Sequence, residues 1–337
     1  MLGPYGFSGS FPPMIIVLLV LALIFDFLNG FHDSSNVVAT PISSNSMRPR
    51  LALLLAAVAH FIAPFLFGVA VATTIGDELL NVEVIQVNVI NAALVAAIAW
   101  NLITWYIGIP SSSSHALVGG LVGAAIIAEG LDAVNPMGLL RVLVALLASP
   151  LLGMAFGYLT MRLVMLATRA SSPSVNSFFR RSQVFTLTAL ALSHGSNDAQ
   201  KTMGVITMGL VTAGILDSFV VPTWVVALSA GAIALGTMSG GWRLIRTLGG
   251  KIYRIRPVHA FSSQASGAAV IFGAALLGGP VSTTQVMSSS IMGVGAADRI
   301  NMVRWGILRE MTTAWALTIP VTALLAGLIY LLISAIA

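Results

Sequence analysis

The sequence predicts an all-α polytopic membrane protein with two inverted-topology repeats, each of about five membrane elements that include broken or re-entrant helices. Three observations support this fold class: charged residues are scarce, acidic and basic residues occupy different breaks between apolar segments, and polar motifs occur twice. Of the 337 residues, 57% are hydrophobic and 8% are charged, whereas a soluble globular protein has about 25% charged residues. This composition excludes an ordinary soluble enzyme, a disordered chain and a coiled coil.

The apolar segments divide into three groups by length. A spanning helix needs about 20 mostly apolar residues, and six segments meet this requirement: 51–74, 85–107, 139–168, 220–242, 259–278 and 305–336. Two longer segments, 14–47 and 183–216, contain polar stretches at 29–36 and 193–201, where we expect a break in the helix. Two shorter, serine-containing segments follow a proline, at 111–128 and 282–296.

The charged residues predict the orientation of these elements. Six acidic residues lie in breaks that contain no Lys or Arg: Asp77, Glu78, Glu83, Glu129, Asp132 and Asp217. The basic breaks lie at 48–50, 162–181, 243–256 and 299–309. If the basic breaks are cytoplasmic, the first long element runs inward and the second runs outward. We therefore expect a first repeat at 14–168, a cytoplasmic connecting loop at 169–182 and an inverted second repeat at 183–336, in a multi-pass protein of the cell inner (plasma) membrane.

The motifs indicate the same duplication independently of charge. GFHD at residues 30–33 recurs as GSND at 195–198, and PSSSS at 110–114 recurs as PVSTT at 280–284. Broken, polar segments at matching positions of two inverted halves are the best sequence indication of a transporter's substrate site. The basic residues form no dense run, so the net charge of +5 is attributed to membrane orientation, and no nucleic-acid partner is expected.

Asp33 and Asp198 are acidic residues in the middle of otherwise apolar segments. A charge at membrane depth needs a partner or a polar cavity, so each is either a structural acid bonded at a helix break, a cation ligand or a proton carrier. The amide oxygens of Asn36 and Asn197 favour a hard cation such as Na⁺ and cannot titrate. Asp26 has no acidic counterpart in the second half.

The two Ser/Thr runs predict an anion site. Each follows a proline and precedes a helix rich in small residues, and the start of a helix favours an anion through its free N–H groups and its dipole. The alternative is that the hydroxyls bond to their own helix or allow close packing. Lys201 is the one basic residue expected at mid-membrane, where it either neutralises Asp198 or adjusts the ion site. His32, His115 and His194 lie in or beside the motifs and are expected to be structural, with proton coupling as the alternative.

At these residues the sequence resembles the inorganic phosphate transporter (PiT) family. Residues 29–40 (NGFHDSSNVVAT) are similar to the first motif of that family, and 193–204 (SHGSNDAQKTMG) to the second in its bacterial form. Residues 108–117 and 279–285 match the paired Pro-Ser/Thr segments. The resemblance implies symport of inorganic phosphate with Na⁺ or H⁺ through an inverted-repeat fold, and it also allows a homodimer.

Our hypothesis is that the protein is a secondary active transporter that imports inorganic phosphate by Na⁺-coupled symport through alternating access in the lipid bilayer. Ser113, Ser114, Thr283 and Thr284 would contact phosphate, and Asp33, Asn36, Asn197 and Asp198 would bind sodium. No cofactor is expected, and Na⁺ is the coupling ion. The alternatives are an H⁺-coupled phosphate symporter, a sulfate permease of the same fold, a channel and, from another class, an intramembrane serine hydrolase that uses His115 or His194.

Overall fold

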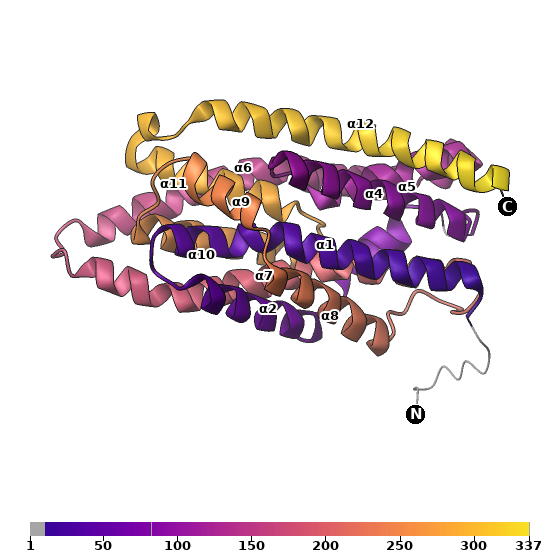
Figure 1. The fold of residues 1–337 in the computed structure, drawn as a ribbon, viewed down its shortest axis with the longest axis horizontal. Helices are drawn as coiled ribbons and strands as arrows, with labels where there is room; N and C mark the ends of the chain where they lie inside the picture. The colour runs from indigo at the N-terminus through magenta and orange to yellow at the C-terminus, as the bar shows by residue number, and fades with distance from the viewer. Residues whose placement is uncertain (1–10, 82, 337) are drawn as a thin grey trace.

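The computed structural model describes residues 11–81 and 83–336, and the chain folds into a long bundle of helices (Figure 1). The first half contains α1 (Pro13–Ser43), α2 (Pro49–Leu66), α3 (Ala70–Thr73), α4 (Val87–Ile107), α5 (Ser113–Glu129) and α6 (Pro136–Thr168). The second half contains α7 (Val175–Thr212), α8 (Thr223–Ser239), α9 (Trp242–Arg246), α10 (Pro257–Leu276), α11 (Thr283–Arg299) and α12 (Trp305–Ile336). A π-helical turn follows α3 (Thr74–Glu78) and α9 (Thr247–Lys251), and a 3-10 turn follows α5 (Leu131–Ala133) and α11 (Ile300–Met302). The same order of elements therefore occurs twice.

The length and exposure of the helices confirm an all-α, multi-pass membrane protein. Within the described ranges, five helices (α1, α2, α4, α6 and α12) are long and apolar enough to cross a membrane. A sixth span results if α8 and the α9 segment, which meet at an angle of 58°, count as one. Leu151 of α6 and Leu324 of α12 are 72% and 71% exposed. Such exposed leucines would be unfavourable in water but suit contact with lipid tails.

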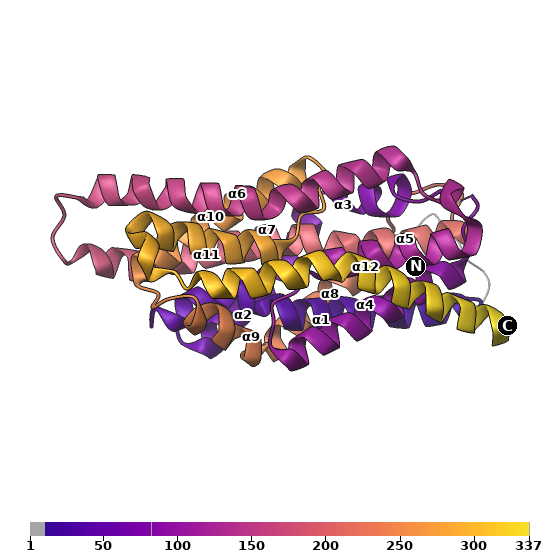
Figure 2. The ribbon, with the colours of Figure 1, turned by 90° about the horizontal axis from the view of Figure 1, so that it is seen from above.

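Basic and acidic connections lie at opposite ends of the bundle. The loops after α1, α6 and α11 lie at one end, whereas the loops before α4, α6 and α8 lie at the other end, together with the start of α1 and the end of α12 (Figures 1 and 2). The first set of loops lies within or beside the basic breaks and the second set contains the acidic ones. We call these the basic end and the acidic end.

The expected breaks in the two long segments are wrong. Both α1 and α7 continue without interruption through 29–36 and 193–201, and serine side chains in these stretches donate to carbonyls of their own helix without opening the backbone. For example, Ser34 donates to the Phe31 carbonyl at 2.8 Å, and Ser196 donates to the Ser193 carbonyl at 2.9 Å. The expected connecting loop at 169–182 is also largely helical, since α7 begins at Val175 and leaves only 169–174 as the link.

The two Pro-Ser/Thr segments instead lie at the turns of two helical hairpins, α4–α5 and α10–α11. Gly108 ends α4 with a φ of 81°, and Gly278 follows α10 with a φ of 70°; glycine adopts this left-handed conformation without steric cost. After a proline, Ser112 and Ser282 accept hydrogen bonds from the backbone N–H groups of residues 115 and 285 and so cap α5 and α11. The first hairpin occupies the half of the bundle near the acidic end, and the second occupies the half near the basic end (Figures 1 and 2).

Each hairpin packs against the last helix of the other half of the chain. Helix α5 lies along α12, and α11 lies along α6. A Cβ atom added at Gly123 of α5 would lie 2.3 Å from the Ala323 carbonyl oxygen, and one at Gly293 of α11 would lie 2.2 Å from the Met154 carbonyl oxygen. Glycine at these two positions therefore allows the close contact that joins the halves.

Candidate ion-binding site

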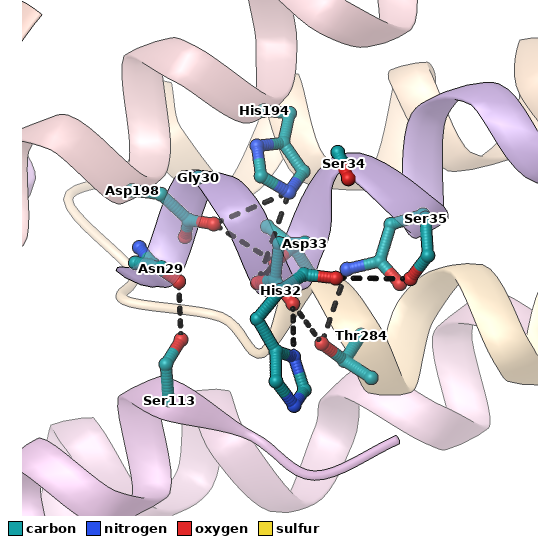
Figure 3. A network of polar contacts seen from close by, with 12 residues as sticks. Asn29, Gly30, His32, Asp33, Ser34, Ser35, Ser113, His194, Asp198 and Thr284 are labelled. Atoms are coloured by element: carbon teal, nitrogen blue, oxygen red, sulfur yellow. Dashed lines mark hydrogen bonds and ion pairs between the residues drawn. The ribbon is translucent and has the colours of Figure 1, made fainter. Parts of the chain in front are cut away.

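The polar parts of α1 and α7 meet both hairpin tips inside the bundle. Asp33 of α1 and Asp198 of α7 are 1% and 0% exposed, and Figure 3 shows the two carboxylates close together with His194. The hydroxyl residues that the sequence predicted for the anion lie at the starts of α5 and α11, as Ser113, Ser114, Thr283 and Thr284. The structure therefore brings residues from four helices, far apart in sequence, into one buried cluster.

The start of α11 contacts both carboxylates. The Thr283 hydroxyl lies 3.2 Å from Asp33 Oδ2 and 3.0 Å from Asp198 Oδ2. Thr284 donates to Asp33 Oδ1 at 2.9 Å, and Asn36 Nδ2 donates to the Thr284 hydroxyl at 3.1 Å. A hydroxyl has one hydrogen, so Thr283 can satisfy only one of the two acids at a time. The Thr283 hydroxyl therefore leaves one of the two carboxylate oxygens without its hydrogen at any moment.

The start of α5 makes a different set of contacts. Ser113 donates to Asn29 Oδ1 at 2.6 Å, and Ser114 donates to the Val281 carbonyl at 3.3 Å. The second contact joins the two hairpin tips directly. Asn29 was not predicted as a site residue, although it opens the first polar motif.

Lys201 neutralises Asp198 and also ties the tips together. Its ammonium group forms a buried salt bridge with Asp198 Oδ1. It also donates to the Ser114 hydroxyl at 2.7 Å and to the Val281 carbonyl at 3.0 Å. Of the two roles considered for Lys201, neutralisation of Asp198 is therefore present, and the contact with Ser114 places the charge beside the hydroxyl run as well.

These contacts cross between the halves. Asn36 of α1 reaches Thr284 at the second tip, and Lys201 of α7 reaches Ser114 at the first tip. Asn36 and Lys201 stand 165 residues apart, and Ser114 and Thr284 stand 170 apart, as the motif spacing requires. Equivalent positions thus make equivalent contacts, each with the hairpin of the opposite half.

The two predicted asparagines each retain an unused oxygen. Asn197 Nδ2 donates to the Gly279 carbonyl at 3.1 Å, so this residue bonds to the segment that leads into α11. In the part of the chain that the structure describes, neither Asn36 Oδ1 nor Asn197 Oδ1 has a hydrogen-bond partner. Buried amide oxygens without donors are suited to a cation.

His194, which was expected to be structural with proton coupling as the alternative, lies in the same cluster. Its Nε2 lies 3.3 Å from Asp198 Oδ2 and 3.9 Å from Asp33 Oδ2. One ligand atom from each of these three residues lies within 4.8 Å of the others. The ring of His60 stacks on His194 with centroids 4.8 Å apart and contacts the Thr237 hydroxyl at 2.7 Å. The position of His194 four residues before Asp198, one helical turn away, was the available sequence signal.

Comparisons with known proteins identify the family. The profile of the phosphate transporter family matches residues 29–326. The chain is 46% identical over 327 residues to a probable low-affinity inorganic phosphate transporter of Bacillus subtilis, with 96% of this chain and 98% of that protein covered. It is 44% identical over 320 residues to a protein of the same description from Rhizobium meliloti, with 94% and 96% covered.

A solved structure described as the sodium-dependent phosphate transporter has the same fold. It covers 97% of this chain and 100% of its own, with a TM-score of 0.89 and 24% sequence identity. The matching family and relatives are transporters and not enzymes, which removes the serine hydrolase. A buried cluster of acids and hydroxyls, a duplicated order of helices and a profile match over most of the length lead to one conclusion: the chain belongs to the phosphate transporter family.

Proposed function

We propose that this protein imports inorganic phosphate with Na⁺ by alternating access, and the observation that carries the proposal is the Thr283 hydroxyl shared by Asp33 and Asp198. Two buried carboxylates with a single ammonium group leave one negative charge uncompensated. Burying such a charge is costly unless it is paired. A monovalent cation beside Asp33 would compensate it, because Lys201 is already engaged by Asp198.

Oxygen ligands are available for that cation. Asp33 and Asp198 supply carboxylate oxygens, and the free amide oxygens of Asn36 and Asn197 supply neutral ones. Hard cations prefer oxygen donors of this kind, which favours Na⁺ over a transition metal despite the nearby imidazole of His194. In this proposal His194 orients the two carboxylates.

Phosphate would bind between the starts of α5 and α11. The first turn of each helix has N–H groups without intrahelical partners, and Ser113, Ser114, Thr283 and Thr284 add hydroxyl donors. At present Thr283 and Thr284 donate to the carboxylates. Na⁺ at Asp33 would compete for the same oxygen lone pairs and free these hydroxyls to donate to phosphate. Cation binding would thereby prepare the anion site, which couples the two fluxes.

The surrounding fold would supply the movement. We propose that 14–168 and 183–336 are inverted repeats that rock against each other, joined through a link at the basic end. The basic end would face the cytoplasm of a cell with the protein in its inner (plasma) membrane, because Lys and Arg concentrate in cytoplasmic loops. The hairpins at opposite ends would then alternate in opening the cluster to each side.

The experiment is uptake of radiolabelled phosphate into proteoliposomes that contain the purified protein. An inward Na⁺ gradient at equal pH should drive uptake, and the same gradient of K⁺ should not. Uptake that responds to a pH gradient but not to Na⁺ would instead support H⁺ coupling. Excess sulfate should compete poorly; stronger competition by sulfate than by unlabelled phosphate would overturn the substrate assignment. Uptake without saturation would indicate a channel.

A further inference from the structure

Asp26 is a buried acid that the phosphate and sodium sites do not use. It lies on α1, seven residues before Asp33, which corresponds to about 10 Å along the helix toward the acidic end. Its side chain is 0% exposed. Neither carboxyl oxygen has a hydrogen-bond partner within residues 11–81 and 83–336. Such a group requires an explanation, because nearly all buried polar atoms are hydrogen-bonded.

Among residues 11–81 and 83–336, no unpaired cation acts on Asp26. The Thr202 hydroxyl lies beside the carboxyl and is itself buried without a partner in the described structure, and the charged groups that act on Asp26 are Asp198 and Lys201. The ammonium group of Lys201 is held by Asp198. Helices α4 and α8, which also pack on α1, carry no Asp, Glu, His, Lys or Arg.

The remaining titratable groups near α1 lie elsewhere. His60 and His194 stack on each other beside Asp33, and the charged residues of α9, α10 and α11 lie toward the basic end (Figure 1). Of the described groups that act on the Asp26 carboxyl, Thr202 is therefore neutral, and Asp198 and Lys201 are paired with each other. An ionised carboxylate would be uncompensated there.

The fold does not require an acid at this position. The motif spacing of 165 residues places Ala191 of α7 at the position equivalent to Asp26, and Ala191 is buried in the apolar core. The duplicated scaffold thus accommodates a small apolar residue where the first half has a carboxyl group. A residue that the packing does not need and that is costly to bury is a candidate for function.

We propose that Asp26 binds one proton in this conformation and exchanges it during the transport cycle, so that the protein carries H⁺ in addition to Na⁺. A hydronium ion of the aqueous phase would transfer its proton to one carboxylate oxygen and leave as water, and the resulting acid could then donate to the Thr202 hydroxyl. A proton fits better than a second Na⁺, because one carboxyl and one hydroxyl offer too few oxygens to replace the hydration shell of a metal ion. The role of Asp26 in the transport cycle rests on the proposed symport, whereas the protonation of Asp26 does not.

The first test separates proton movement from phosphate movement. Wild-type protein and Asp26→Asn, which is nearly isosteric and cannot titrate, are reconstituted with equal inward Na⁺ gradients and a pH-sensitive dye inside the vesicles. The wild type and the variant carry the same phosphate species. A difference between them in the number of protons delivered per phosphate therefore reports the contribution of Asp26. We expect Asp26→Asn to retain Na⁺-driven uptake and to deliver one proton fewer per phosphate. Equal proton yields and equal dependence of uptake on external pH would overturn the proposal.

The second test does not depend on transport. Infrared spectra of the purified protein should contain the C=O stretching band of a protonated carboxylic acid that is lost in Asp26→Asn and shifted in Thr202→Val, which removes only the hydroxyl partner. A spectrum without an Asp26-dependent band would show that Asp26 does not hold a proton. A band that disappears when Na⁺ replaces K⁺ would show that Asp26 is a sodium site and not an additional proton site. If Na⁺ fails to drive uptake while the band is present, the proposed symport is wrong and the proton site stands.

Discussion

The two halves of the chain share an arrangement of helices but differ in charge at the site. Asp198 has a fixed cation in Lys201, whereas the equivalent acid, Asp33, is contacted only by hydroxyls and by the rings of His32 and His194 among the described residues. The position equivalent to Lys201 is Asn36, which is neutral. Two halves with the same order of helices can therefore hold one acid that is permanently paired and one acid that remains available to a mobile cation.

The first prediction concerns Asp33, the acid without a fixed cation. Asp33→Asn should reduce Na⁺-dependent phosphate uptake about 100-fold, equivalent to about 3 kcal/mol, because the mobile cation loses its charged ligand. The measurement is the initial rate of uptake in proteoliposomes with and without Na⁺. Asp132→Asn, an exposed acid near the acidic end, is the control and should behave as wild type. Na⁺ stimulation that persists in Asp33→Asn would contradict the proposed role.

The second prediction concerns the fixed pair. Asp198→Asn should lower the free energy of unfolding by about 3–5 kcal/mol, since it leaves the buried ammonium of Lys201 without a partner. Asp33→Asn should not destabilise the protein in this way. Thermal unfolding in detergent measures both variants. The double variant Asp198→Asn with Lys201→Asn should recover most of the loss, and a double variant as unstable as the single one would refute the pairing argument.

The third prediction concerns the packing of the two hairpins. It tests whether the contact of α5 with α12 and that of α11 with α6 are equivalent, although the charges of the two halves are not. Gly123→Ala and Gly293→Ala should each cost about 1–3 kcal/mol of stability, because the added methyl group would meet the backbone of the opposite half. Gly231→Ala is the matched control, as nothing lies within 4 Å of its added Cβ atom. The same thermal measurement applies. A large difference between the first two variants would show that the hairpin contacts are not equivalent.

The fourth prediction compares substitutions in the two hydroxyl runs and has the smallest magnitude. Ser114→Ala and Thr284→Val should each raise the KM for phosphate about 10-fold, the loss expected from one hydrogen bond to a charged ligand. The concentration dependence of uptake at saturating Na⁺ measures this value, with the exposed Ser172→Ala as control. If only Thr284→Val changes KM, phosphate contacts one tip and the symmetric site is incorrect.

The local features of this fold were predictable, and the long-range ones were not. The starts of α5 and α11 follow from the Pro-Ser/Thr runs, because proline and a capping hydroxyl determine where a helix can begin. The continuity of α1 and α7 was missed, since a polar stretch in an apolar sequence was interpreted as a break. The same stretch remains helical when its side chains find partners on neighbouring helices, such as Asn36 on Thr284.

The composition of the cluster was predictable only in part. Four hydroxyls and two acids were identified because they occur in matched motifs, whereas Asn29 and His194 occupy equivalent positions with different chemistry. A search for identical residues at equivalent positions of the two halves cannot find Asn29 and His194, because an amide and an imidazole do not match. Asn197 shows the same limit, because the contact of its Nδ2 with the Gly279 carbonyl, which leaves its Oδ1 unpartnered among the described residues, follows from packing and not from spacing.

The crossed packing of the hairpins has a consequence for how such a chain assembles. Helix α5 is covered by α12, and α11 by α6, so neither half encloses its own hairpin. Two fragments separated in the short link at 169–174, at the projecting tip of the α6–α7 pair (Figure 2), would each expose a groove that only the other fills. Within one chain, the link at 169–174 keeps each half beside the half that covers its hairpin, so this packing forms without a bimolecular step.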